Sequence, residues 1–205
     1  MSKTKYDSLT DTEKEKLAKT LKNELPEPYQ DLTRYNVLKH EYDFYPGWIC
    51  YEIGQREQLH GKPLIALVKG DKGILLDWNP QTVYTINQEI PLNLTVRNVC
   101  KYLEFFFQYT RVPEGRMLIV NNSDHFQWRE EPPLAVRKTL ASVIQPAMVV
   151  AWDEDENTYE VNAFLMFKNH LFNALIQINH KGIIEILDRS VQVEDMPLIS
   201  DLTSQ

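Results

Sequence analysis

The sequence predicts an α+β fold: mostly antiparallel strands in two meanders, with a central aromatic helix between the two blocks of strands. Three observations support this fold. Segments typical of strands come in two blocks and do not alternate with helices, which argues against a parallel α/β sheet. Short turn sequences separate the strands within each block, as in antiparallel sheets. A strongly apolar helical pattern lies between the two blocks along the chain.

The N-terminal part of the sequence predicts a helix that lies on the surface. Thr10 followed by Glu13 forms the pattern of a capping box, which marks a helix start, and Pro26 ends the helical segment. Apolar residues form only a narrow stripe on this helix, so one face is expected to be buried. We therefore predict an N-terminal helix and linker at residues 1–28, a single α+β domain at residues 29–193 and a C-terminal tail at residues 194–205.

The first block of strands is expected to form a meander. Gly70 lies in a short polar segment typical of a hairpin turn, and glycine is favoured where the backbone angle φ is positive. Pro46 and Gly47 are expected to bend the first strand. The predicted strands are residues 42–53, 64–68, 73–77 and 82–86.

The central helix follows Thr95 and carries two apolar stripes. The first has the spacing of one helix face and consists of Val96, Val99, Cys100, Leu103, Phe106 and Phe107. The second stripe consists of Tyr102, Phe105 and Tyr109. A helix that is apolar over so much of its surface is either covered on two sides or presents aromatic side chains to a partner.

The second block contains one more helix and five strands. Pro132 and Pro133 are suited to a first helical turn, and Pro146 ends that helix. We expect Val136, Leu140, Val143 and Ile144 of this helix to point inward. The predicted strands are residues 117–120, 148–152, 159–167, 171–179 and 183–187.

Composition excludes several classes of function. The chain has 205 residues and a formal net charge of −7, with no run of basic residues, which disfavours binding to nucleic acid. No uncharged apolar segment approaches the length of a membrane span. Two cysteines without an apolar leader segment are typical of a reducing compartment, so we expect a cytoplasmic protein. Dinucleotide, phosphate-loop, zinc-protease and serine-esterase motifs are all missing, and we expect neither a cofactor nor a metal.

Polar residues gather between residues 121 and 131, after a predicted strand and before a predicted helix. Asp124, His125 and Glu130 are residue types that act in general acid–base chemistry, and Arg129 is suited to holding an anion. A solvated loop that caps the following helix explains the same residues, because carboxylates are favoured near a helix N-terminus.

These observations are consistent with two functions. The first is a non-catalytic cytosolic binding or adaptor protein that contacts a protein partner or a second copy through aromatic side chains. The residues expected to form this contact are Tyr45, Trp48, Tyr102, Phe105, Tyr109 and Trp128. The alternative is a small hydrolase centred on Asp124, His125 and Arg129. It requires a distant polar group to converge on His125, for which Glu52, Asp77 and Asp188 are the candidates.

Overall fold

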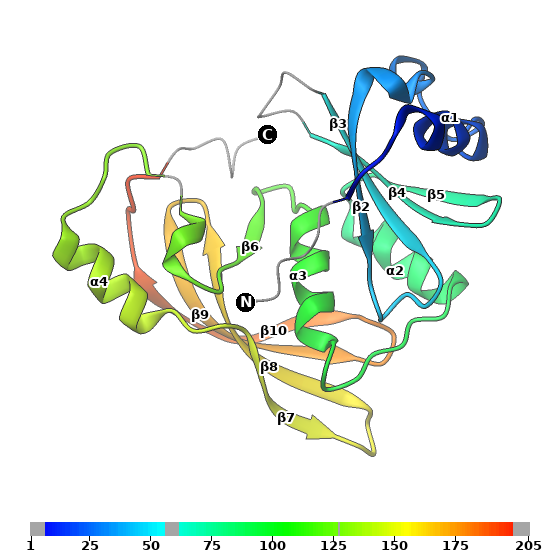
Figure 1. Ribbon diagram of the computed structural model, residues 1–205. Coiled ribbons are helices and arrows are strands. Elements are labelled where there is room, and N and C mark those ends of the chain that lie inside the picture. The colour runs from blue at the N-terminus through cyan, green and yellow to red at the C-terminus, as the bar shows by residue number, and fades with distance from the viewer. Residues whose placement is uncertain (1–6, 56–61, 127, 199–205) are drawn as a thin grey trace. The chain divides into compact units, whose positions relative to one another are not determined.

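Figure 1 shows the computed structural model of the protein, which describes residues 7–55, 62–126 and 128–198. The α+β fold with two antiparallel sheets is confirmed. By compactness the chain divides into two units, Met1–Asp77 and Trp78–Gln205, each with its own sheet. This division falls after Asp77, whereas the boundaries expected after residues 28 and 193 remain a prediction.

The first unit is built on a five-stranded antiparallel meander. Neighbouring strands in the sheet are also neighbours in sequence, so every connection is a hairpin or a return through α1 (Asp11–Thr20). The strands, in order across the sheet, are β1 (Asp7–Ser8), β2 (Tyr35–Glu41), β3 (Ile49–Gln55), β4 (Leu64–Lys69) and β5 (Lys72–Leu76).

Helix α1 covers one face of this sheet and begins at the predicted capping box. The Thr10 hydroxyl accepts from the Glu13 amide at 3.4 Å, and the Glu13 carboxylate accepts from the Thr10 amide at 2.8 Å. Leu17 and Leu21 project from the narrow apolar stripe into a buried cluster with Ile53 and other sheet residues. Two short 3-10 turns, η1 (Glu27–Tyr29) and η2 (Leu32–Arg34), lead from the helix into β2.

The strand expected at residues 42–53 is only partly correct. Its first half, residues 42–48, is the connection between β2 and β3, where the Tyr45 amide donates to the Tyr42 carbonyl and the Trp48 amide to the Tyr45 carbonyl. Gly47 has a φ of +77°, which supports the turn. Strand β2 was not predicted from the sequence, whereas the hairpin of β4 and β5 was, with Gly70 at φ +62° in its turn.

The strand expected at residues 82–86 is wrong, because these residues lie in helix α2 (Pro80–Glu89). Asn79 caps the helix by accepting from the Gln81 amide at 2.9 Å, and Pro80 occupies its first turn. Val83, Ile86 and Ile90 are buried at the spacing of a helix face. The segment therefore forms a helix because its apolar residues have helical spacing, although several of them are β-branched.

The second unit packs helix α3 (Val99–Tyr109) with an antiparallel sheet in the order β10-β9-β8-β6, and β7 also pairs with β8. Strand β8 is long enough to pair with β6 near its C-terminal end and with β7 near its N-terminal end, along the same edge. The strands are β6 (Met117–Ile119), β7 (Met148–Asp153), β8 (Thr158–Phe167), β9 (His170–Asn179) and β10 (Ile184–Val193).

A buried tyrosine ties α3 to the rest of the second unit. The Tyr102 hydroxyl donates to the Gly182 carbonyl at 2.8 Å and accepts from the Asn87 amide group of α2, also at 2.8 Å. Asn87 donates in addition to the Lys181 carbonyl at 3.1 Å. Gly182 has a φ of +74°, and a Cβ there would collide with Tyr102 and Asn87. Glycine at this turn is therefore required both by the backbone and by the close approach of the ring.

Helix α4 (Leu134–Val143) packs less deeply than the sequence predicted. Leu140 and Ile144 are buried as expected, in a cluster with Phe126, Phe164 and other apolar residues. Val136 and Val143, which were expected to point inward, are 44% and 38% exposed. The prediction was wrong for these two residues because only a narrow stripe of the helix reaches the cluster.

The contact between Gly73 and Leu21 gives a direct test of the first unit. A Cβ at Gly73 would collide with the buried Leu21 side chain, so Gly73→Ala should lower the free energy of unfolding by about 1–3 kcal/mol. Denaturant unfolding monitored by circular dichroism measures the change. Gly54→Ala is the matched control, because no non-neighbouring atom of the described residues lies within 4 Å of its Cβ position. Equal stability of the two variants would show that Leu21 does not pack against strand β5 at Gly73.

Candidate functional site

The polar cluster predicted at residues 121–131 lines a cavity in the second unit. The cavity has a volume of about 430 Å³ and lies between α4 and the 3-10 turn η3 (Ser123–His125). Asp124, Trp128 and Glu131 line it from the loop, and Arg137 and Lys138 line it from the helix. Three residues of the polar cluster therefore line this cavity together with two basic residues that α4 contributes, and whether the cluster is a functional site stays a prediction.

Asparagines build the loop that forms one wall. Asn122 caps η3 by accepting from the Asp124 amide at 2.9 Å. Asn121 donates to the Glu104 carboxylate of α3 at 2.7 Å and accepts from the Ala147 amide at 3.0 Å, just before β7. These two amide side chains therefore help to fix the conformation of the loop.

Apolar and charged groups share the remaining surface of the cavity. Phe126 and Trp128 form an edge-to-face aromatic pair with ring centres 5.4 Å apart. Glu131 forms an ion pair with Arg137, but both side chains are largely exposed, so the pair adds little stability. With carboxylates and cations in similar number, the cavity is suited to a small polar molecule more than to a simple anion or cation.

The proposed catalytic residues do not gather at this cavity as a hydrolase would require. Among the described residues that line it, Asp124 is present, but Arg129 and Glu130 are not. The Arg129 backbone amide donates to the Pro197 carbonyl at 2.8 Å, so this hydrogen bond holds the backbone of Arg129 against residue 197. The side chain of His125 lies outside what the structure describes.

Two of the groups expected to converge on His125 have neighbours elsewhere. Glu52 lies 3.9 Å from the imidazole of His40, on adjacent strands of the first sheet. Asp188 accepts from the Arg189 amide at 2.8 Å on β10. The hydrolase hypothesis is therefore supported by the position of Asp124 alone.

The aromatic residues expected to form a contact surface are buried. Tyr102, Phe105 and Tyr109 of the second stripe are at most 1% exposed, and Tyr45 and Trp48 are 1% and 7% exposed. Phe105 packs edge-to-face with Tyr109, and Tyr45 packs in the same way with Phe44. These five side chains therefore belong to the core, and the expectation that they face a partner is not retained. Trp128 is half-buried at the cavity.

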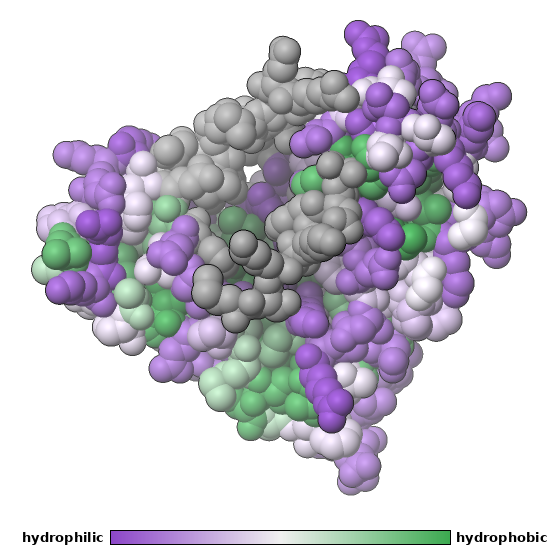
Figure 2. All heavy atoms as spheres, in the orientation of Figure 1, coloured by the Kyte–Doolittle hydropathy of each residue, from purple (hydrophilic) through white to green (hydrophobic). Residues whose placement is uncertain are grey.

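Strand β7 carries exposed apolar residues that were not predicted from the sequence to form a contact surface. Met148, Val150 and Trp152 are each about half exposed, and Trp152 stacks on Tyr159 with ring centres 6.3 Å apart. Figure 2 shows apolar side chains gathered over the region of β7 and β8. A continuous apolar run such as residues 147–152 indicates a strand buried on both faces. Here the strand instead lies at the end of a sheet, which the sequence does not reveal.

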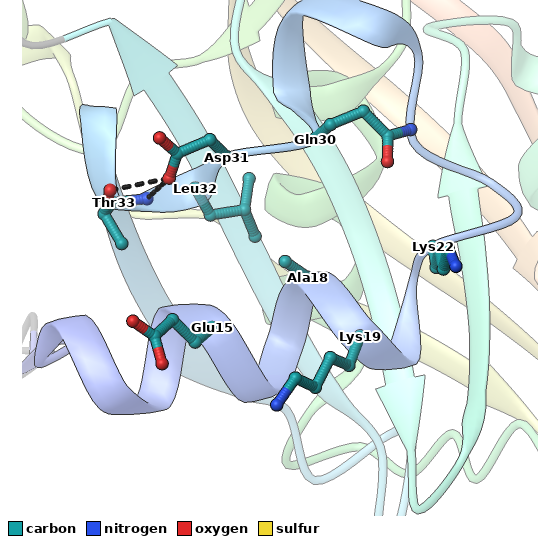
Figure 3. Close-up of a pocket in the computed structure, with 8 residues that line it drawn as sticks. All are labelled: Glu15, Ala18, Lys19, Lys22, Gln30, Asp31, Leu32 and Thr33. Atoms are coloured by element: carbon teal, nitrogen blue, oxygen red, sulfur yellow. Dashed lines mark hydrogen bonds between the residues drawn. The ribbon is translucent and has the colours of Figure 1, made fainter.

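A second hollow lies in the first unit between α1 and η2 and has a volume of about 440 Å³ (Figure 3). Glu15, Lys19 and Lys22 reach it from the helix side. On the other side, Asp31 accepts from the Thr33 hydroxyl at 2.6 Å and from the Thr33 amide at 3.1 Å, which lowers the pKa of Asp31. Asp31 therefore acts as the cap of η2, and the charged side chains that line the groove are exposed and of both signs.

Comparisons with known proteins give no relative. The chain matches no family model, no curated protein and no solved structure. Within the described residues, no helix is both long and apolar enough to cross a membrane. The same part of the chain contains no group of three or more His, Cys, Asp or Glu side chains placed to hold a metal ion.

The two cysteines are free thiols with raised pKa values. Cys50 is fully buried, and burial raises its pKa. Cys100 on α3 is half-buried, and burial together with the nearby Glu104 carboxylate raises its pKa to about 11. A thiol with a raised pKa is a poor nucleophile at neutral pH because little thiolate is present.

Thiol alkylation tests this environment. At pH 8 a thiol of pKa 11 is ionised in about one molecule in a thousand, against roughly a quarter for an ordinary thiol. Iodoacetamide should therefore label Cys100 in the native protein about 100-fold more slowly than in protein unfolded by guanidinium. Mass spectrometry of tryptic peptides separates Cys100 from Cys50. Equal labelling rates in native and unfolded protein would contradict this assignment.

Proposed function

We propose that the protein is a non-catalytic binding protein that makes protein–protein contacts through strand β7. The observation that carries this proposal is that Met148, Val150 and Trp152 are each about half exposed on one six-residue strand. Isolated exposed apolar residues are common on protein surfaces, whereas a contiguous apolar patch marks an interaction site.

The strand has a free edge on which a partner can add a strand. One edge of β7 pairs with β8, and within the described residues no strand pairs with the other edge. Natural proteins protect such edges with lysine, proline, inward charges or a bulge. Strand β7 contains a bulge between Val149 and Ala151, but it has no lysine or proline, and its only charge is Asp153 at the end.

The side chains of β7 are of the types that dominate binding energy at interfaces. Tryptophan and methionine are enriched at the centres of protein interfaces, and a buried tryptophan is often a hot spot. Trp152 is held in place by stacking on Tyr159, which is itself buried and donates to the Leu94 carbonyl at 3.1 Å. A side chain held rigid before binding loses less conformational entropy in the complex.

The other parts of the proposal follow from composition. The chain is acidic and has no basic run, so we propose a protein partner or a second copy of the chain as the ligand, and not nucleic acid. Two free cysteines support a reducing compartment, and we infer a cytoplasmic protein. The alternative, a small hydrolase at Asp124, is less well supported because only one of its named residues lines the cavity.

Substitution of Trp152 tests the contact surface. Trp152→Asp places a charge at the proposed centre and should abolish self-association or partner capture, because burying an unpaired charge is strongly unfavourable. Light scattering after size exclusion measures the mass over a range of concentrations. Pull-down with the purified chain as bait measures partner capture.

Val191→Asp is the matched control. Val191 is 47% exposed on β10, also at the end of a sheet, so it matches Trp152 in exposure but not in position. It should leave association unchanged. A wild-type protein that stays a single chain at all concentrations and captures no partner would contradict the proposal, as would equal effects of the two substitutions.

A further inference from the structure

A third hollow lies in the first unit where α1 meets the sheet, and three lysines line it. It has a volume of about 300 Å³, at the lower end of the range of ligand pockets. Leu17 from α1, Ile49 from β3 and Val68 from β4 form its apolar floor. Ile49 and Val68 are register partners, so both project from the sheet face that α1 covers.

The three lysines come from three different elements. Lys16 lies on α1, Lys39 on β2 and Lys69 at the end of β4. Lys39 is the register partner of Tyr51, whose ring also lines the hollow. Convergence of ammonium groups from separate elements concentrates positive potential in one concave site, although the whole chain carries a net charge of −7.

The backbone positions Lys69 at the wall of the hollow. The Lys69 ammonium donates to the Pro46 carbonyl at 3.3 Å. A Cβ at Gly47 would lie 3.1 Å from the Lys69 Nζ atom, which is closer than almost all real contacts. Glycine at position 47 therefore leaves room for the ammonium group, in addition to permitting the positive φ of the turn.

The carboxylates near the hollow are already engaged. Glu13 lines it, but its Oε2 atom accepts from the Thr10 amide at 2.8 Å and from the Thr10 hydroxyl at 2.7 Å, which lowers the pKa of Glu13. Lys39 forms an ion pair with Glu41 at 2.8 Å, but Glu41 is 69% exposed, so this partner is easily displaced. Among the described residues that line the hollow, three lysines therefore accompany one carboxylate, that of Glu13, which serves as a helix cap.

We infer that this hollow binds a small organic carboxylate whose apolar part lies on Leu17, Ile49 and Val68 and whose carboxylate is held by the three lysines. Tyr51 also lines the hollow, and its hydroxyl can act as a further donor because a phenol is protonated at neutral pH. The inference is independent of the contact proposed at β7, since it concerns the other unit.

Titration of the full chain with octanoate tests the inference by nuclear magnetic resonance. The amides of Gly47 and Gly70, which line the hollow, should shift saturably, while the Gly182 amide of the second unit should not. Acetate has the same charge without the apolar part, and octanol has the apolar part without the charge. Both should bind at least about tenfold more weakly than octanoate, because each lacks one of the two contacts. Equal binding of either one, or no saturable shift, would overturn the inference.

Charge-removing variants identify the lysines. Lys39→Gln and Lys69→Gln should each weaken octanoate binding by about two- to fivefold, as expected for partly exposed ion pairs. Lys19→Gln is the matched control, because Lys19 lies on the same helix but lines the other groove. It should leave the affinity unchanged, and circular dichroism should show all three variants folded. Unchanged affinity in both test variants, or an equal loss in Lys19→Gln, would overturn the assignment.

Discussion

A buried hydroxyl group holds the second unit together. The Tyr102 hydroxyl is fully shielded from water, so its two hydrogen-bonding partners must come from the protein itself. They come from α2 and from the turn between β9 and β10, which are far apart in sequence. The ring can reach this turn only because Gly182 has no side chain. The aromatic helix is thus fixed against both its neighbouring helix and one end of the sheet.

This constraint decides which apolar residues remain for contact with other molecules. Because the aromatic residues of both stripes of α3 are buried, they stabilise the core and do not form an outer surface, whereas Val96 of the first stripe is 45% exposed just before the helix. Strand β8 lies inside the sheet, paired along one edge with β9 and along the other with β6 and β7. Strand β7, which pairs with β8 on one edge only, carries three of the exposed apolar residues of the unit, Met148, Val150 and Trp152. The lysine-lined hollow of the first unit arises separately, where α1 meets its sheet.

Sequence reasoning gave the fold class, the capping box at Thr10 and the position of the polar loop, because each depends on local spacing. It failed for α2. Val83 and Ile86 of this helix have β-branched side chains, which favour strands, but they have the spacing of a helix face and follow the helix cap at Asn79. It failed for the contact surface because the exposure of a side chain depends on tertiary packing. Trp152 and Phe105 are both large aromatic residues, yet only Phe105 is buried. The lysine cluster was also missed, since Lys16, Lys39 and Lys69 meet only through strand register and helix packing.

In this structure Tyr102 and Asn87 act as one hydrogen-bonded unit that fixes α3. A double-mutant cycle with Tyr102→Phe and Asn87→Ala, measured by urea unfolding, tests this coupling. Each single change should lower the free energy of unfolding by about 1–3 kcal/mol, because a buried polar group loses a partner. The double variant should lose less than the sum by about 1 kcal/mol, since the two changes remove one shared bond. Losses that simply add would contradict the claim and show that α3 is held by apolar packing alone.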